Sequence, residues 1–144
     1  MPRRARGHRA VSAQQARAPI EPATRGPGEP FHREARARLA SLLTGIDSLV
    51  VPAIFDVEVT SALIRGGAAG ASVREYLARD LAARELITIG PRAARAISGV
   101  AARTRLRATD AAYVWVASSR GLPLVTLDRE IARKVEMLCQ VEAP

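Results

Sequence analysis

Short, largely apolar stretches alternate with longer helical patterns along most of this sequence, and this alternation constrains the fold more than any other feature. The stretches are SLVVP (48–52), ITI (87–89), PLVT (123–126) and LCQVE (138–142). Strands that are apolar on both faces are typical of a parallel sheet covered by helices on each side. The alternation therefore predicts an α/β fold, a three-layer sandwich with a central, mostly parallel sheet.

The segments around these stretches have the apolar spacing and end signals of helices. Proline opens two of them, at Pro30 and Pro91, and a glycine ends two, at Gly45 and Gly121. Ser72, with Glu75 three residues later, predicts a capping box, and Thr109 is a candidate cap. The expected helices cover 30–45, 53–67, 72–86, 91–106, 110–121 and 128–136.

The first 29 residues differ in composition from the rest and are expected to form a basic, Pro/Arg-rich, disordered segment ahead of a domain covering 30–144. Much of the net charge of +8 belongs to this end, since residues 1–38 hold nine arginines and three acids. HRAVSA (8–13) is a poor strand candidate. The segment fits either a solvated tail or an arm that binds phosphate backbones without reading sequence.

Three carboxylates lie where functional groups gather in α/β folds, outside the carboxyl ends of the strands. Asp128 follows the stretch 123–126, Asp110 opens a helix, and Glu58 lies in the helix after 48–52. Taken singly, Asp110 fits a helix-terminus charge. Glu58 shares a largely apolar helix face, where a glutamate is costly unless it is paired or metal-bound, and a surface position is the alternative. Together at one edge the three acids would repel one another, and a divalent cation such as Mg²⁺ or Mn²⁺ would remove that conflict.

Other catalytic chemistries lack their residues. The two histidines, His8 and His32, fall outside the predicted core, and the single Cys139 has no partner for a disulfide or a zinc site. The glycine-rich RGGAAG (65–70) lacks the spacing and the Lys-Ser/Thr of a phosphate-binding loop. No apolar run approaches the roughly 18 residues of a membrane span.

Two blocks, VPAIFDVEVTSALIRG and RATDAAYVWVASSRGLPLVTLDREIAR, resemble in content and order the PIN domain family, specifically the VapC-type ribonuclease toxins of bacterial toxin–antitoxin pairs. The resemblance implies a sandwich with an acidic metal site. Glu58, Asp110 and Asp128 match the family's acids, which hold Mg²⁺ or Mn²⁺ and orient a water for RNA cleavage. Thr126 matches the hydroxyl that accompanies the site.

The family also has a first strand in the middle of its sheet, an apolar run ending in an Asp that supplies a further metal ligand. Residues 1–30 contain two acids, Glu21 and Glu29, and neither follows an apolar run. The expectation is that this strand is absent or degenerate and that its ligand is missing. The composition changes abruptly near residue 30. An altered start site or reading frame upstream of this residue is one hypothesis for that change.

Three functions follow as alternatives. The first is a metal-dependent endoribonuclease toxin, cytoplasmic and without a membrane segment, that forms a homodimer and is inhibited by a cognate antitoxin. The second is a catalytically impaired PIN-like domain that binds antitoxin or RNA without cleaving. The third is a nucleic-acid-binding protein that works through its basic arm.

Overall fold

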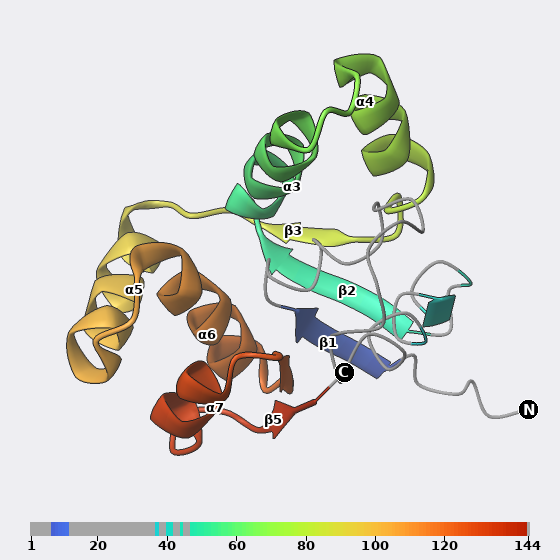
Figure 1. Ribbon diagram of the computed structural model, residues 1–144. Helices are drawn as coiled ribbons and strands as arrows, with labels where there is room; N and C mark the ends of the chain where they lie inside the picture. The colour runs from blue at the N-terminus through green and yellow to red at the C-terminus, as the bar shows by residue number, and fades with distance from the viewer. Residues whose placement is uncertain (1–6, 12–36, 38–39, 42–43, 45–46, 144) are drawn as a thin grey trace, which may run out of the picture.

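A computed structural model describes residues 7–11, 37, 40–41, 44 and 47–143. Five parallel strands form its sheet, in the order β3-β2-β1-β4-β5 (Figure 1). The strands are β1 (Gly7–Val11), β2 (Asp47–Pro52), β3 (Glu85–Ile87), β4 (Leu124–Val125) and β5 (Val141–Glu142). The predicted parallel sheet is therefore confirmed, and the carboxyl ends of all its strands meet at one edge.

The first strand was expected to be absent or degenerate, and the structure excludes the first of these alternatives, because a strand is present. β1 lies between β2 and β4, with Ala10 opposite both Val50 and Leu124 and with Val11 opposite Val125. A strand in this position takes ladder hydrogen bonds on both sides, and backbone groups supply these bonds whatever the side chains are. Tertiary pairing therefore overrides the weak local strand pattern. The predicted boundary at residue 30 and most of the predicted helix 30–45 lie outside the described residues.

Five helices surround the strands in the described part of the chain: α3 (Ile54–Arg65), α4 (Gly70–Arg79), α5 (Pro91–Thr104), α6 (Ala108–Arg120) and α7 (Arg129–Val135). Each corresponds to a predicted helix, and the prediction was least accurate for α4. That helix begins after Ala69 rather than at Ser72, and no side-chain cap closes its start. Its end also comes earlier than predicted: the Arg84 guanidinium donates hydrogen bonds to the Leu77 and Leu81 carbonyls, and the chain then enters β3.

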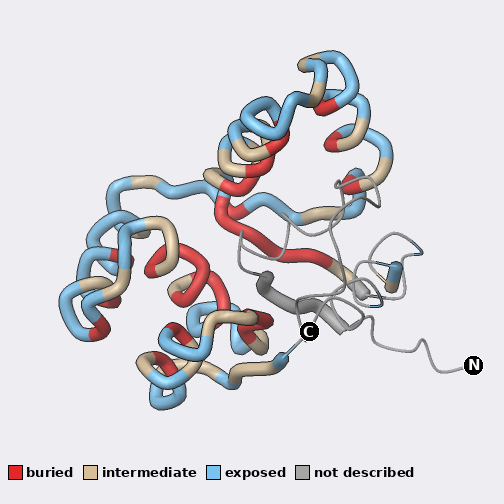
Figure 2. The backbone as a smooth tube through the Cα atoms, viewed as in Figure 1, coloured by how far each residue is buried: buried red, intermediate tan, exposed pale blue. Residues whose placement is uncertain are grey.

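The core runs along β2 and α6, which carry an almost continuous run of buried residues (Figure 2). Helix α6 packs against β1, β2 and β4, and Ala111, Ala112 and Ala117 allow the close approach of its backbone to the sheet. A helix buried on most of its sides is held firmly. Its first turn, which contains Asp110, is thereby fixed relative to the sheet.

Among the helices of the described residues, none combines the length and the apolar composition that crossing a membrane requires.

Candidate active site

Glu58 lies in the second turn of α3, which begins directly after the carboxyl end of β2. Phe55 and Val59 bury the core-facing side of this helix, and Glu58 is half-buried beside them. Its Oε2 accepts a hydrogen bond of 2.8 Å from the hydroxyl of Tyr113 on α6. A surface position without a partner, one of the two alternatives from the sequence, therefore does not describe Glu58.

Tyr113 is a site residue that the sequence motifs did not single out. Its ring packs in the core, where the residue is 1% exposed. Burial first, then the hydrogen bond to Glu58 and the charges of Glu58, Asp110 and Asp56, raise the pKa of Tyr113. The hydroxyl therefore stays protonated and remains a donor to Glu58. Its spacing of three residues from Asp110 is the signal that places both on the same side of α6.

Asp110 is the third residue of α6 and is half-buried. Burial raises the pKa of its carboxyl, the nearby Arg107 lowers it, and the charge of Asp128 raises it further, with a net upward shift. Thr109 does not cap the helix as predicted, because the N-cap position is taken by Arg107 and no side chain bonds there. Asp110 thus carries a disfavoured negative charge beside a second carboxylate.

Asp128 is the N-cap of α7, and its Oδ1 accepts hydrogen bonds from the backbone N–H groups of Glu130 (2.8 Å) and Ile131 (3.1 Å). The backbone N–H of Asp128 donates to Thr126 Oγ1 at 3.1 Å. Thr126 is 5% exposed, at the end of β4. Its hydroxyl therefore fixes the turn that directs Asp128 toward the strand edge, and it acts on the backbone rather than on the carboxylate.

The structure brings Asp110 and Asp128 within electrostatic reach of each other, and it ties Glu58 to them through Tyr113. As these side chains stand, no three Asp, Glu, His or Cys residues of the described chain are grouped closely enough to share a metal ion. The donor chemistry nevertheless fits a hard divalent cation. Mg²⁺ commonly binds through one or two carboxylates and keeps several waters, and a cation would relieve the repulsion that raises the pKa of Asp110.

A second pair supports the helix that carries Glu58. Arg84 binds Asp56 through two hydrogen bonds of 2.7 Å, and these side chains are 13% and 29% exposed. Since Arg84 also bonds to two carbonyls at the end of α4, the pair joins α3 to the turn before β3. This contact was not predicted, because its partners lie far apart in the sequence.

Comparison with known proteins decides the family. The sequence model of the PIN domain matches residues 27–136. The chain belongs to the PIN domain family. It is 41% identical over 103 residues to Ribonuclease VapC3 of Mycobacterium tuberculosis, and the match covers 68% of this chain and 69% of that protein. The resemblance drawn from the two sequence blocks is thereby confirmed. Nucleases of this PIN family generally depend on a divalent metal ion.

Two solved structures share the PIN fold. PAE2754 from Pyrobaculum aerophilum has a TM-score of 0.63 at 20% identity, over 94% of this chain and 83% of that one. FitAB, solved bound to an IR36 DNA fragment, has a TM-score of 0.66 at 15% identity, over 94% of each chain. These likenesses, which extend over 94% of this chain, support the fold. The sequence match begins at residue 27, so β1 lies outside it.

Proposed function

We propose that this chain is a metal-dependent endoribonuclease that hydrolyses RNA phosphodiester bonds and acts as the toxin of a type II toxin–antitoxin system. One observation supports it most strongly. Asp110 in the first turn of α6, Asp128 at the start of α7 and Glu58 bonded to Tyr113 stand at the ends of helices beside the sheet, in a chain that is 41% identical to a protein named a ribonuclease. Paired acids of this kind suit metal-assisted phosphodiester hydrolysis.

Glu58, Asp110 and Asp128 are the residues that would hold Mg²⁺ or Mn²⁺. When bound, the ion supplies an activated water and offsets charge on the scissile phosphate. The protein's own residues prepare the position: Tyr113 orients the Glu58 carboxylate, and Thr126 fixes the turn before Asp128. These bonds hold the acids in place before substrate arrives, which lowers the cost of ordering them.

The central strand brings no carboxylate of its own. In the family the first strand ends in an Asp, whereas the residue that follows β1 here is Ser12. β1 therefore completes the sheet while the site keeps three acids. Because affinity for hard cations rises with the number of charged ligands, we expect three acids to bind the metal more weakly than four would.

The partners follow from the same assignment. A cognate antitoxin, a second copy of the chain in a homodimer and a cytoplasmic location are parts of this proposal, supported by the likeness to Ribonuclease VapC3. Co-expression with the protein encoded next to its gene would test the antitoxin, and light scattering of the purified chain would test the dimer. A monomer that captures no partner would remove this part of the proposal.

Cleavage of RNA by the purified chain tests the activity. We expect cleavage with Mg²⁺ or Mn²⁺, loss of cleavage with a chelator, and loss in Asp110→Asn. Glu75→Gln, which removes an acid from the exposed surface of α4, serves as the matched control and keeps wild-type activity. If the folded wild-type chain cleaves no RNA with either metal, it is the impaired binding domain instead.

A further inference from the structure

A run of arginines without acids lies directly before Asp110. Between Glu85 and Asp110 the chain has no Asp or Glu. It has five arginines there, all of them exposed: Arg92, Arg95, Arg103, Arg105 and Arg107. None of the five forms an ion pair with a described residue, whereas Arg79, Arg84 and Arg120 each do. This segment therefore presents positive charge that the rest of the described surface does not neutralise.

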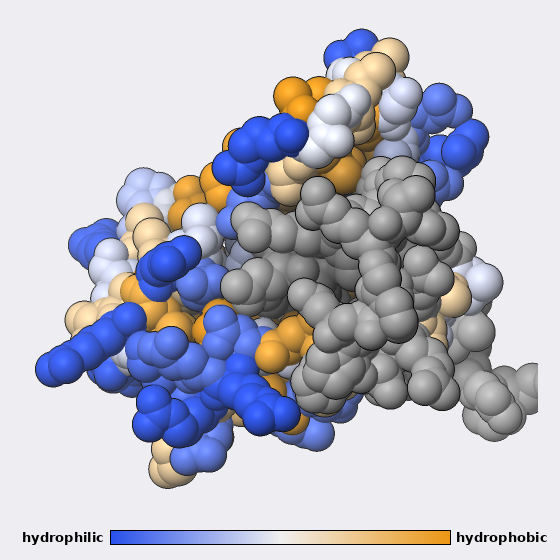
Figure 3. All heavy atoms as spheres, in the orientation of Figure 1, coloured by the Kyte–Doolittle hydropathy of each residue, from blue (hydrophilic) through white to orange (hydrophobic). Residues whose placement is uncertain are grey.

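Helical geometry places three of these arginines on one side of α5, and the other two follow its end. At 3.6 residues per turn, Arg92, Arg95 and Arg103 fall within an arc of roughly 80°. The buried Ile97 and Val100 lie on the other side of the helix, against the core. We call the five arginines the arginine face. Figure 3 shows hydrophilic side chains extending from the part of the molecule that contains α5.

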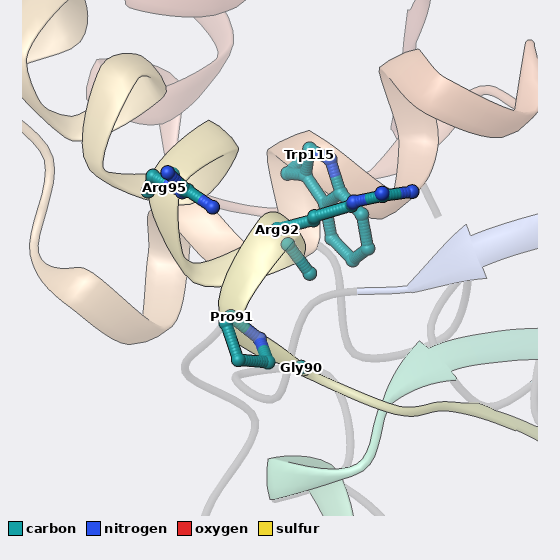
Figure 4. Close-up of a pocket in the computed structure, with 6 residues that line it drawn as sticks. Gly90, Pro91, Arg92, Arg95 and Trp115 are labelled. Atoms are coloured by element: carbon teal, nitrogen blue, oxygen red, sulfur yellow. The ribbon is translucent and has the colours of Figure 1, made fainter.

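The two ends of the arginine face differ. At one end Arg105 caps α5 in the left-handed conformation (φ 55°), and Arg107 follows close enough to Asp110 to lower the pKa of its carboxyl. At the other end Arg92 and Arg95 line an open hollow together with Trp115 of α6 (Figure 4). Helix α5 has 14 residues and spans about 21 Å between these ends.

Trp115 and the two arginines match the groups that bind single-stranded nucleic acid. Aromatic rings stack with bases, and guanidinium groups pair with phosphates and also stack. Trp115 is partly buried against the core, so its ring is held in place without being covered completely. Core packing alone explains the position of the ring, but it does not explain the two arginines beside it, which pair with no acid of the described residues.

We propose that the arginine face binds the phosphate backbone of single-stranded RNA that leaves the acidic site along α5, and that the hollow at Trp115 receives one of its bases. The inference rests on the proposed function for its substrate class. An acidic protein segment would meet the same charge, whereas single-stranded RNA presents both a phosphate to the guanidinium groups and a flat base to the indole ring at each nucleotide. RNA is therefore the occupant that both features favour.

Trp115 is the only tryptophan of the chain, so its fluorescence reports on the hollow directly. The full chain, with a chelator present to suppress cleavage, is titrated with a short single-stranded RNA at several salt concentrations. We expect the fluorescence to be quenched as RNA binds. Arg92→Gln together with Arg95→Gln should weaken binding about tenfold and reduce the salt slope by about 1.4, the value for two single-strand phosphate contacts.

The matched control removes the same charge elsewhere. Arg65→Gln with Arg74→Gln takes two exposed arginines, unpaired within the described chain, from α3 and α4, and should weaken binding less than about twofold. Circular dichroism checks that both double variants are folded. Equal losses in the two double variants, or RNA binding without a change in Trp115 fluorescence, would overturn the proposal. So would quenching by polyglutamate but not by RNA.

The design separates this inference from the proposed function, because binding is measured without cleavage. A wild-type chain that cleaves no RNA, yet binds it through Arg92 and Arg95, would remove the nuclease assignment and leave the arginine face standing. Equal cleavage and equal RNA binding with and without these two arginines would keep the nuclease assignment and remove the arginine face.

Discussion

Replacing Tyr113 by phenylalanine removes one hydroxyl and leaves the ring that fills the core. The hydroxyl donates a 2.8 Å hydrogen bond to Glu58, and the ring is 1% exposed. Hydrogen bonds to charged groups contribute about 1.5–3 kcal/mol, but water can replace the donor on the half-buried Glu58. We therefore expect Tyr113→Phe to lower the free energy of unfolding by about 1–1.5 kcal/mol, a shift of about 3–5 °C in Tm.

The same change tests whether the hydroxyl matters for catalysis. If Tyr113 orients Glu58, kcat for RNA cleavage should fall about tenfold, which corresponds to about 1.4 kcal/mol, while KM for RNA stays nearly constant. A double-mutant cycle with Glu58→Ala measures the coupling in unfolding experiments, and we expect at least about 0.5 kcal/mol.

The other tyrosine provides the control. Tyr76 on α4 is partly buried and its hydroxyl makes no hydrogen bond with a described residue, so Tyr76→Phe should change stability by less than about 0.5 kcal/mol and leave kcat unchanged. The reasoning is refuted if Tyr113→Phe behaves like Tyr76→Phe in both assays, or if the cycle shows no coupling between Tyr113 and Glu58.

Three further variants test other contacts. Asp56→Asn leaves Arg84 poorly paired in a partly buried position and should lower the free energy of unfolding in urea by about 2 kcal/mol. Glu75→Gln, at an exposed pair, should lower it by less than about 0.5 kcal/mol. Equal losses in the two variants would contradict this. Asp128→Ala should lose about 1 kcal/mol as well as cleavage, whereas Asp128→Ser keeps a capping oxygen and should lose cleavage alone. Burial raises the pKa of Asp110, so without metal the folded chain holds this proton to higher pH than the unfolded chain. Stability should then fall as pH rises from about 3.9 through the raised value, and Asp110→Asn should show a smaller fall; identical pH profiles would count against it.

The sequence predicted well the elements whose apolar spacing is strong. The strand at 48–52 and the helix after it correspond to β2 and α3, and the strand at 123–126 corresponds to β4. Local patterns failed where tertiary contacts decide. β1 has little strand character of its own and is extended because β2 and β4 pair with it. Arg84, inside the predicted helix 72–86, instead pairs with Asp56, which is 28 positions away, and donates to the carbonyls of Leu77 and Leu81 after α4 has ended.

The candidate site also has a part that local sequence predicts and a part that only the fold reveals. The two sequence blocks and their order were enough to select Glu58, Asp110 and Asp128, and the roles of these residues as metal ligands stay a prediction. The hydrogen bond from Tyr113 to Glu58 joins residues 55 positions apart, and no local pattern could have indicated it. The upward shift in the pKa of Asp110 likewise depends on burial and on Asp128, which only the folded chain brings near.

The central claim is that Glu58, Asp110 and Asp128 together hold a divalent metal ion, and direct measurement of Mn²⁺ binding tests it. Electron paramagnetic resonance of the free ion, titrated with the full chain, gives the number and affinity of bound ions. The account predicts one Mn²⁺ per chain, lost or weakened at least about tenfold in Asp110→Asn and unchanged in Glu75→Gln. Binding that is absent from the folded wild-type chain, or equal in wild type and Asp110→Asn, would contradict it.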